Sequence, residues 1–240
     1  MSSRRFSVQV GIAIAALVFS QGGAVVVLRL LGAGDQPYAL LIINTVFLVA
    51  CIICVRLSRM STEDIGLKLL PPHLARHIIL CLVILSLYVL YYLLGVRISG
   101  LRPLTSATMW TLLAYLVIAF AEEIYFRGIL YRLLSKKYSG RAAAIGSAVF
   151  FAAFHLRQGP VALLRLPTGL LWASIRYSSG MIFLLAFPVH FAYNAVWLLF
   201  QGKWDSPPSW AVLVPLGELL LGLLIIILPS PVLRSGTDEA

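Results

Sequence analysis

The chain has 240 residues, of which 60% are hydrophobic and only 12% are charged. Its mean hydropathy is +0.94, and its charged share is about half that of an ordinary soluble protein. These values exclude a disordered chain, a fibrous chain and an ordinary soluble domain. The apolar runs are continuous rather than alternating, so they indicate membrane-spanning helices and not a transmembrane β-barrel.

Basic residues outnumber acidic ones, with 19 Lys and Arg against 9 Asp and Glu, which gives a net charge of +10. In a soluble protein this excess would suggest nucleic acid as a partner. Here the charges lie in short loops between apolar runs, without a long basic stretch. We therefore expect contact with anionic membrane lipids and no nucleic-acid partner.

Eight apolar segments are expected to cross the membrane as helices, about residues 8–31, 38–55, 76–96, 106–130, 142–156, 161–175, 181–200 and 210–228. The fifth and sixth segments are short. The first is too long for a signal peptide and is expected to be retained. Between the second and third segments, Ser61 or Thr62 is expected to cap a short interfacial helix. The fold class is therefore all-α: one helical membrane bundle over residues 1–240, whose functional core lies at about 106–200.

The distribution of basic residues predicts the orientation of the bundle. With eight spans, twelve basic residues fall on one side, namely Arg4, Arg5, Arg56, Arg59, Lys68, Arg76, Arg132, Lys136, Lys137, Arg141, Arg176 and Arg234. Five fall on the other side, namely Arg97, Arg102, Arg157, Arg165 and Lys203. The positive-inside rule then places both termini in the cytoplasm of a multi-pass protein of the cell membrane.

Ionisable residues inside apolar spans are costly, so each of them is a candidate for function. The densest group contains Glu122, Glu123 and Arg127. Arg127 follows Glu123 by four residues, so a helix allows the two to pair. Glu122 then points about 100° away from this pair. In a medium of low dielectric, its carboxyl group is suited to act as a base near neutral pH.

Two further segments carry polar residues at helical spacing. His155 follows Phe151 by four residues, and Asn194 follows His190 by four. At about 1.5 Å per residue from the cytoplasmic end of each span, Glu122 and His190 lie roughly 15 Å deep and His155 roughly 21 Å deep. The three side chains are therefore expected to meet at a common depth.

This constellation allows two kinds of chemistry. Glu122 and His155 can polarise a water for attack on a carbonyl, while His190 and Asn194 donate hydrogen bonds to the oxyanion. Alternatively, Glu122, His155 and His190 form a possible zinc ligand set that leaves a fourth position for water. The sequence alone does not choose between a metal-free site and a metal site.

The remaining polar and thiol groups in the spans are interpreted as structural. Arg29 and Glu218 are expected to pair with each other, or Arg29 to extend to the membrane interface. Cys51, Cys54 and Cys81 lie in apolar runs and are expected to be packed as small hydrophobic residues, although Cys51 and Cys54 have CxxC spacing.

The three motifs resemble those of the CPBP family, the CAAX proteases and bacteriocin-processing enzymes. Glu122, Glu123 and Arg127, followed by Gly128, match the family motif E-E-x-x-x-R. Phe151 and His155 match F-x-x-x-H, and His190 and Asn194 match H-x-x-x-N. The resemblance covers residues 122–194, and the motifs occur in the family's order.

The resemblance implies an intramembrane endopeptidase that acts near the cytoplasmic face on a peptide or lipidated protein, as CAAX-type processing requires. It implies that Glu122 and His155 activate water, that His190 and Asn194 form the oxyanion site, and that Glu123 and Arg127 organise both. The family is commonly labelled a metalloprotease family, but its CAAX branch is described as glutamate-dependent, which favours the metal-free mechanism here. The alternatives are a non-catalytic scaffold or bacteriocin self-immunity protein, and a proton-coupled carrier.

Overall fold

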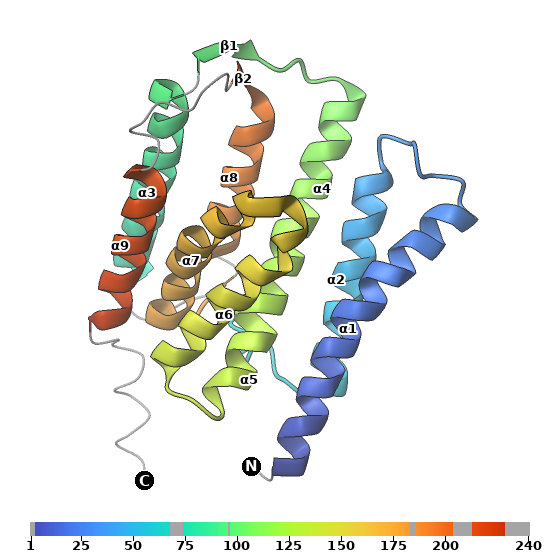
Figure 1. Cartoon of the computed structure of the whole chain (residues 1–240), viewed down its shortest axis with the longest axis vertical. Coiled ribbons are helices and arrows are strands. Elements are labelled where there is room, and N and C mark those ends of the chain that lie inside the picture. The colour runs from blue at the N-terminus through green and yellow to red at the C-terminus, as the bar shows by residue number, and fades with distance from the viewer. Residues whose placement is uncertain (1–2, 68–73, 96, 183–185, 204–212, 229–240) are drawn as a thin grey trace.

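The computed structural model of the chain describes residues 3–67, 74–95, 97–182, 186–203 and 213–228. Its elements in chain order are α1 (Ser3–Leu30), α2 (Ala39–Leu57), α3 (Leu74–Gly95), β1 (Arg97–Leu101), α4 (Ser106–Glu122), η1 (Glu123–Leu130), α5 (Tyr131–Ser135), α6 (Gly140–Phe154), η2 (Leu156–Leu164), α7 (Arg165–Ser179), α8 (Ala186–Leu199), β2 (Phe200–Lys203) and α9 (Leu213–Ile227). Helices dominate the described chain, which confirms the expected all-α bundle (Figure 1).

One short pair of strands was not expected from the sequence. β1 pairs with β2 in antiparallel register, Arg97 opposite Lys203 and Leu101 opposite Phe200. This ribbon joins the end of α3 to the end of α8 and lies at the top of the molecule in Figure 1. Both strands lie outside the long apolar helices, where backbone groups that leave a helix need new hydrogen-bond partners.

The longest rod in the bundle is continuous from Ser106 to Ser135 but has three parts, α4, η1 and α5. Thr105 caps its start, because its hydroxyl accepts a hydrogen bond from the backbone N–H of Thr108 at 3.2 Å. The middle part, η1, is a π-helix. The sequence prediction of one helix over 106–130 was therefore right in extent, but it missed the change of helix type.

Three helices are long and apolar enough to cross a membrane, namely Phe6–Leu30, Ala39–Leu57 and Ser106–Ser135. Shorter apolar helices occupy Leu74–Leu90, Gly140–Phe154 and Leu213–Ile227. α6 and α7 have 15 residues each, about 22 Å of helix against a hydrocarbon core of about 30 Å. The count of eight spans and the cytoplasmic termini stay predictions.

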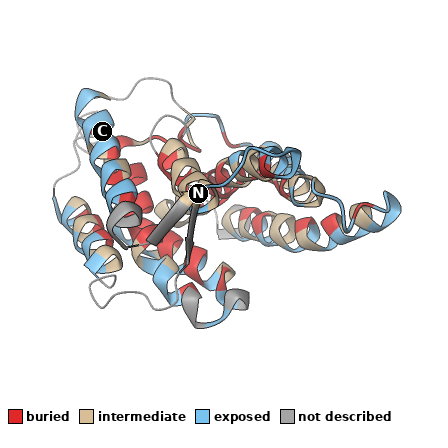
Figure 2. Cartoon of the chain, turned by 90° about the horizontal axis from the view of Figure 1, so that it is seen from above, coloured by how far each residue is buried: buried red, intermediate tan, exposed pale blue. Residues whose placement is uncertain are grey.

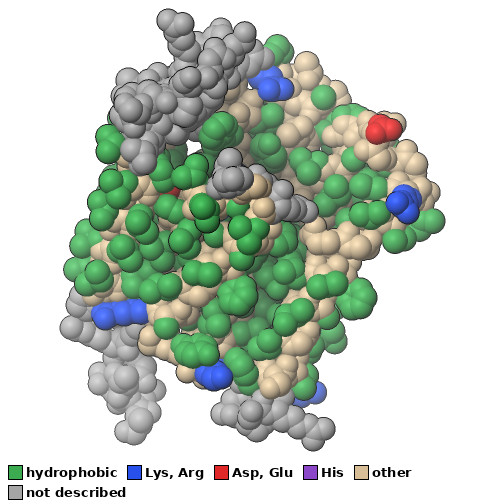
Figure 3. Space-filling view, in the orientation of Figure 1, with side chains coloured by type: hydrophobic (Ala, Val, Ile, Leu, Met, Phe, Trp, Pro, Cys, Tyr) green, Lys and Arg blue, Asp and Glu red, His purple; other side chains and the backbone are tan. Residues whose placement is uncertain are grey.

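The helices bury one side and expose the other. Seen from above, buried residues lie on the helix sides that face one another (Figure 2). The apolar core joins several helices through Phe47, Ile84, Phe126 and Trp172. The outer face is mostly hydrophobic, with Lys and Arg near its edges (Figure 3). Phe19 on α1 is 74% exposed, as expected for a side chain that faces lipid.

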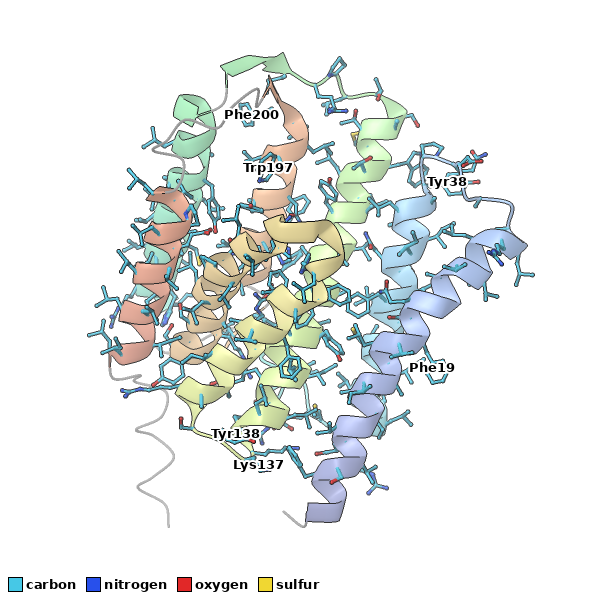
Figure 4. All side chains as sticks on the ribbon, viewed as in Figure 1. Phe19, Tyr38, Lys137, Tyr138, Trp197 and Phe200 are labelled. Atoms are coloured by element: carbon cyan, nitrogen blue, oxygen red, sulfur yellow. The ribbon has the colours of Figure 1, made fainter. Side chains whose placement is uncertain are left out.

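Aromatic residues lie toward both ends of the bundle. Tyr38 and Phe200 lie near the upper end in Figure 4, and Lys137 and Tyr138 lie near the lower end. Tyr38 also packs edge-on against Trp110, with ring centroids 6.0 Å apart. Amphipathic rings at both ends are typical of membrane interfaces, so the two ends are consistent with the two headgroup regions.

The expected interfacial helix between the second and third segments is wrong for the residues described there. Residues 61–67 form a tight turn in which the Ser61 N–H donates to Asp64 Oδ2 and the Asp64 N–H donates to Ser61 Oγ, both at 3.0 Å. Gly66 then adopts a φ of +80°, which ends the helical path. Residue 68, the last of the expected helix, lies outside the described residues.

Candidate active site

The site begins where the α-helix α4 changes to the π-helix η1. Glu122 is the last residue of α4 and Glu123 the first of η1. Both are buried, at 5% and 0% exposure. Gly128 makes the wide turn of η1 fit, because a Cβ there would lie 3.1 Å from Ile65. Single π-helical turns of this kind occur most often at functional sites, where they re-aim side chains.

Glu123 and Arg127 form the ion pair expected from their spacing. Arg127 Nη1 lies 3.1 Å from Glu123 Oε1, and both side chains are fully enclosed. Arg127 Nη2 donates to the carbonyl of Gly169 on α7 at 3.2 Å, and its guanidinium carbon lies 4.2 Å from the centroid of the Phe151 ring. The pair therefore links η1 to α6 and α7 inside the bundle.

His155 caps the C-terminus of α6. Its Nδ1 lies 2.8 Å from the carbonyl oxygen of Phe151, four residues earlier. A carbonyl only accepts hydrogen bonds, so Nδ1 carries the proton. Nε2 of the neutral ring is then an acceptor, and it lies 3.8 Å from Glu122 Oε1.

His190 on α8 contacts both glutamates. Its Nδ1 donates to Glu123 Oε1 at 2.9 Å, and its Nε2 lies 3.6 Å from Glu122 Oε2. The ring stacks on Trp172 of α7, with centroids 4.0 Å apart and planes at 29°. Thus the carboxylate of one residue and the Nε2 atoms of two imidazoles converge, and Glu122, His155 and His190 meet as the sequence analysis expects. Their depth in the membrane stays a prediction.

The three converging groups can all accept a hydrogen bond. The Glu122 carboxylate accepts only, and Nε2 of each neutral imidazole also accepts. At 3.6 and 3.8 Å from the carboxylate, neither ring is in direct hydrogen-bond contact with it. A water molecule can satisfy acceptors of this kind by donating its two protons. The arrangement is therefore suited to hold and polarise one water.

Asn194 is the one predicted site residue that the structure does not join to the others. It lies one turn after His190 on α8 and is half-buried. Among the described contacts, it has no hydrogen bond to Glu122, Glu123, His155 or His190. Its amide is placed on the same helix face as His190, where a bound substrate could reach both.

The donor set was tested for a metal. Glutamate and histidine are ligands that suit zinc. In the part of the chain that the structure describes, however, no group of three or more His, Cys, Asp or Glu side chains is arranged to hold a metal ion.

The sequence analysis missed two buried residues beside the site. Trp172 was read as part of an apolar segment, although its stacking on His190 fixes that ring. Arg176 was counted among the loop residues, but it is only 6% exposed. Its guanidinium donates to the carbonyls of Arg127 at 3.1 Å, Asp64 at 2.9 Å and Gly180. The sequence signal that could have indicated its burial is its position directly after an apolar run.

The proposed pairing of Arg29 with Glu218 is wrong. Glu218 accepts hydrogen bonds from Tyr88 at 2.6 Å and from Thr168 at 2.7 Å, within the interior between α3, α7 and α9. Arg29 lies in the last turn of α1 and is exposed. The three cysteines are free and buried, as the packing interpretation expects.

The fold and the site define a helical membrane protein with a buried carboxylate–imidazole centre. A family model described as Type II CAAX prenyl endopeptidase Rce1-like matches residues 104–196. The matched segment runs from the start of α4 into α8 and contains all six predicted site residues. The match confirms the resemblance of this segment to the CAAX proteases. A comparison with curated proteins finds no match.

Proposed function

We propose that the protein is an intramembrane endopeptidase that hydrolyses a peptide bond near the C-terminus of a membrane-bound, lipidated substrate, without a catalytic metal. One observation carries this proposal: the carboxylate of Glu122 and the Nε2 atoms of His155 and His190 converge on one point inside the bundle. The Glu122 carboxylate and the His155 imidazole can both accept hydrogen bonds from a water, and His190 lies beside them, where a tetrahedral intermediate would form.

In the proposed reaction, a water bound between Glu122 and His155 donates its protons to both. As its oxygen attacks the scissile carbonyl carbon, one proton moves to Glu122. The C–N bond then breaks, and the leaving amine takes this proton from Glu122. The glutamate is thereby returned to its starting state, and no other reactant is needed.

The oxyanion of the tetrahedral intermediate requires donors. Asn194 supplies a side-chain N–H, and His190 supplies Nε2–H when its ring carries both protons. In that state His190 still donates Nδ1–H to Glu123 at 2.9 Å, and it stacks on Trp172. Glu123 and Arg127 act through His190, because their ion pair orients its ring.

The test uses purified protein in detergent or lipid vesicles and a peptide that ends in a prenylated cysteine and three further residues. We expect Glu122→Gln and His155→Gln to lower kcat by about 10²- to 10⁴-fold. The matched control is Glu218→Gln, which removes another buried carboxylate, 8% exposed, that lies outside the proposed site. Its activity should stay near that of the wild type.

A strong chelator separates the metal-free mechanism from its alternative. The metal-free site predicts an unchanged rate after chelation, whereas a rate that is lost and restored by zinc would contradict this part of the proposal. Full activity of both Glu122→Gln and His155→Gln would contradict the roles assigned to those residues. A wild-type protein that cleaves no peptide, with variants that keep the cellular phenotype, would favour a scaffold or immunity protein instead.

A further inference from the structure

Arg165 occupies an unusual place for a charged residue. It is the first residue of α7, directly after η2, at the turn of the hairpin that α6 and α7 form. Each of these helices is about 22 Å long, and in Figure 1 their turn lies well below the β1–β2 ribbon. The sequence analysis expects Arg165 in a loop on the side opposite the cytoplasm, whereas in the structure it is the first residue of α7 and lies beside Tyr193 of α8.

The Arg165 guanidinium has no acidic partner among the described residues. Its Nε is buried and has no hydrogen-bond partner. Its guanidinium carbon lies 5.9 Å from the ring centroid of Tyr193 on α8. Glu218 is close enough to interact with its charge but forms no ion pair with it, and both Glu218 oxygens accept from Tyr88 and Thr168. Tyr193 shares a side-chain hydrogen bond with Arg165, but this neutral partner leaves the charge uncompensated. An arginine among apolar helices is costly without an anionic partner, so this position favours an anionic ligand.

Aromatic contacts connect Arg165 to the site. Trp172 follows it by seven residues, which is two turns on the same face of α7 and about 10 Å along the axis. Trp172 stacks on His190 at 4.0 Å. Tyr193, one turn after His190, contacts both Trp172 and Arg165, at 5.9 Å each. The charge of Arg165 also acts on His155 and His190.

Arg165 therefore lies beside the aromatic residues of the site and outside the group of converging side chains. We propose that Arg165 binds the C-terminal carboxylate of the substrate while the scissile bond lies at Glu122 and His155. The planar guanidinium fits a carboxylate with two parallel hydrogen bonds. This inference rests on the proposed endopeptidase function and names a specificity residue for it.

The experiment compares two peptides that are identical except at the C-terminus. Both carry a prenylated cysteine followed by three residues, and one ends in a free carboxylate and the other in a carboxamide. We expect the wild type to cleave the acid with a kcat/KM about 10- to 100-fold higher, because a charged hydrogen-bonded pair is lost with the amide. Arg165→Gln should cleave the acid as slowly as the amide, mainly through a raised KM, and should cleave the amide at the wild-type rate.

Two further variants sharpen this result. Arg165→Lys keeps the charge but not the two-pronged geometry, and we expect it to keep part of the preference. Arg102→Gln removes an exposed arginine just beyond β1, and the full preference should remain. Binding of both peptides to the Glu122→Gln variant, followed by Trp fluorescence, gives a readout that needs no cleavage.

Distinct outcomes separate this proposal from the function on which it rests. Equal cleavage and equal binding of acid and amide by the wild type would overturn the role of Arg165 while leaving the peptidase intact. A loss in Arg165→Gln that is the same for both peptides would show a structural role and would also overturn it. Failure of the wild type to cleave either peptide would instead contradict the proposed function, and binding to Glu122→Gln would still test Arg165.

Discussion

The core segment, residues 104–196, and the α1–α2 pair differ in the kind of polar side chain that they bury. The core segment buries charged side chains: Glu122, Glu123, Arg127 and Arg176 are all below 9% exposure. In the described part of α1 and α2, the buried polar residues are uncharged, namely Gln9, Ser20 and Asn44. In this comparison the buried charged residues lie in the matched family segment, and outside it Glu218 on α9 is also buried.

The two regions also differ in the interactions that stabilise them. Apolar helices in lipid gain no hydrophobic driving force from contact with each other, so close packing and a few hydrogen bonds join them. The α1–α2 pair is linked to the rest in this way, for example by Asn44, which donates to the Ala114 carbonyl at 3.0 Å. The core segment instead depends on the geometry of its charged groups. Single polar substitutions should therefore affect the core segment far more than the α1–α2 pair.

The largest difference in stability between the two regions is expected when an arginine is replaced in each. Arg127→Met leaves Glu123 as a buried carboxylate without its ion-pair partner, which should lower the free energy of unfolding by about 3–5 kcal/mol. Arg29→Met, in the exposed last turn of α1, should change it by less than about 0.5 kcal/mol. Thermal or denaturant unfolding in detergent measures both.

The double variant Glu123→Gln/Arg127→Met checks the reason for this loss. It removes both charges, so it should recover much of the stability that Arg127→Met loses. A double variant that is no more stable than Arg127→Met would show that packing of the guanidinium, rather than the unpaired charge, explains the effect.

Glycines of positive φ offer a second comparison. Gly66 has a φ of +80°, and a Cβ there would lie 2.7 Å from the Arg176 guanidinium. Gly66→Ala should therefore combine backbone strain with a clash and cost about 2–4 kcal/mol. Gly32, between α1 and α2, has a φ of +57° with open space around it, so Gly32→Ala should cost only the strain, about 1–2 kcal/mol. Equal melting temperatures for the two variants would show that Arg176 moves aside freely.

The smallest difference in unfolding free energy is expected when an aspartate outside the spans is replaced, and this difference depends on pH. Partial burial raises the pKa of Asp64, but hydrogen bonds with Ser61 and the charge of Arg132, 2.8 Å away, outweigh burial and hold the pKa below its ordinary value of 3.8. Because the pKa is lower in the folded state, the stabilisation is present above about pH 4. It is lost as the pH falls through the folded pKa.

Asp64→Asn should accordingly lower the unfolding free energy by about 0.2–1 kcal/mol at pH 7, since the pair is partly exposed. This difference should shrink on acidification toward pH 3. Asp35→Asn, in the exposed turn between α1 and α2, serves as the control and should change the unfolding free energy at pH 7 by less than about 0.5 kcal/mol. Unfolding curves at several pH values provide the measurement, and a difference for Asp64→Asn that grows at low pH would contradict the assignment.

Much of the site could be predicted because it depends on spacing within single helices. The four-residue interval of Glu123 and Arg127 predicts their ion pair, and counting from the span ends predicts that Glu122, His155 and His190 meet. The interval also predicts that His190 and Asn194 share a face. What could not be predicted is the π-helix η1, since no local pattern distinguishes it from an α-helix when the extra residue is accommodated by packing against Ile65.

Residues that act across helices were harder to find. Trp172 and Arg176 belong to an apolar segment and its end, and only the packing of α7 against η1 and α8 turns them into neighbours of His190 and Arg127. Glu218 was paired with the wrong partner because charge complementarity ignores distance. Its actual partners, Tyr88 and Thr168, are neutral, and an apolar context gives no signal for them in the sequence.

The sequence by itself determined that the chain is an all-α membrane protein, and it identified the six polar residues whose presence in apolar spans demands a reason. It could do so because hydropathy and helix periodicity are local properties. Only the tertiary structure decided that two imidazoles approach the Glu122 carboxylate, and that Arg165 lies against Tyr193 beside the site. These relations depend on how far each helix extends and which face it turns to its neighbours, and both are set by packing between segments distant in the chain.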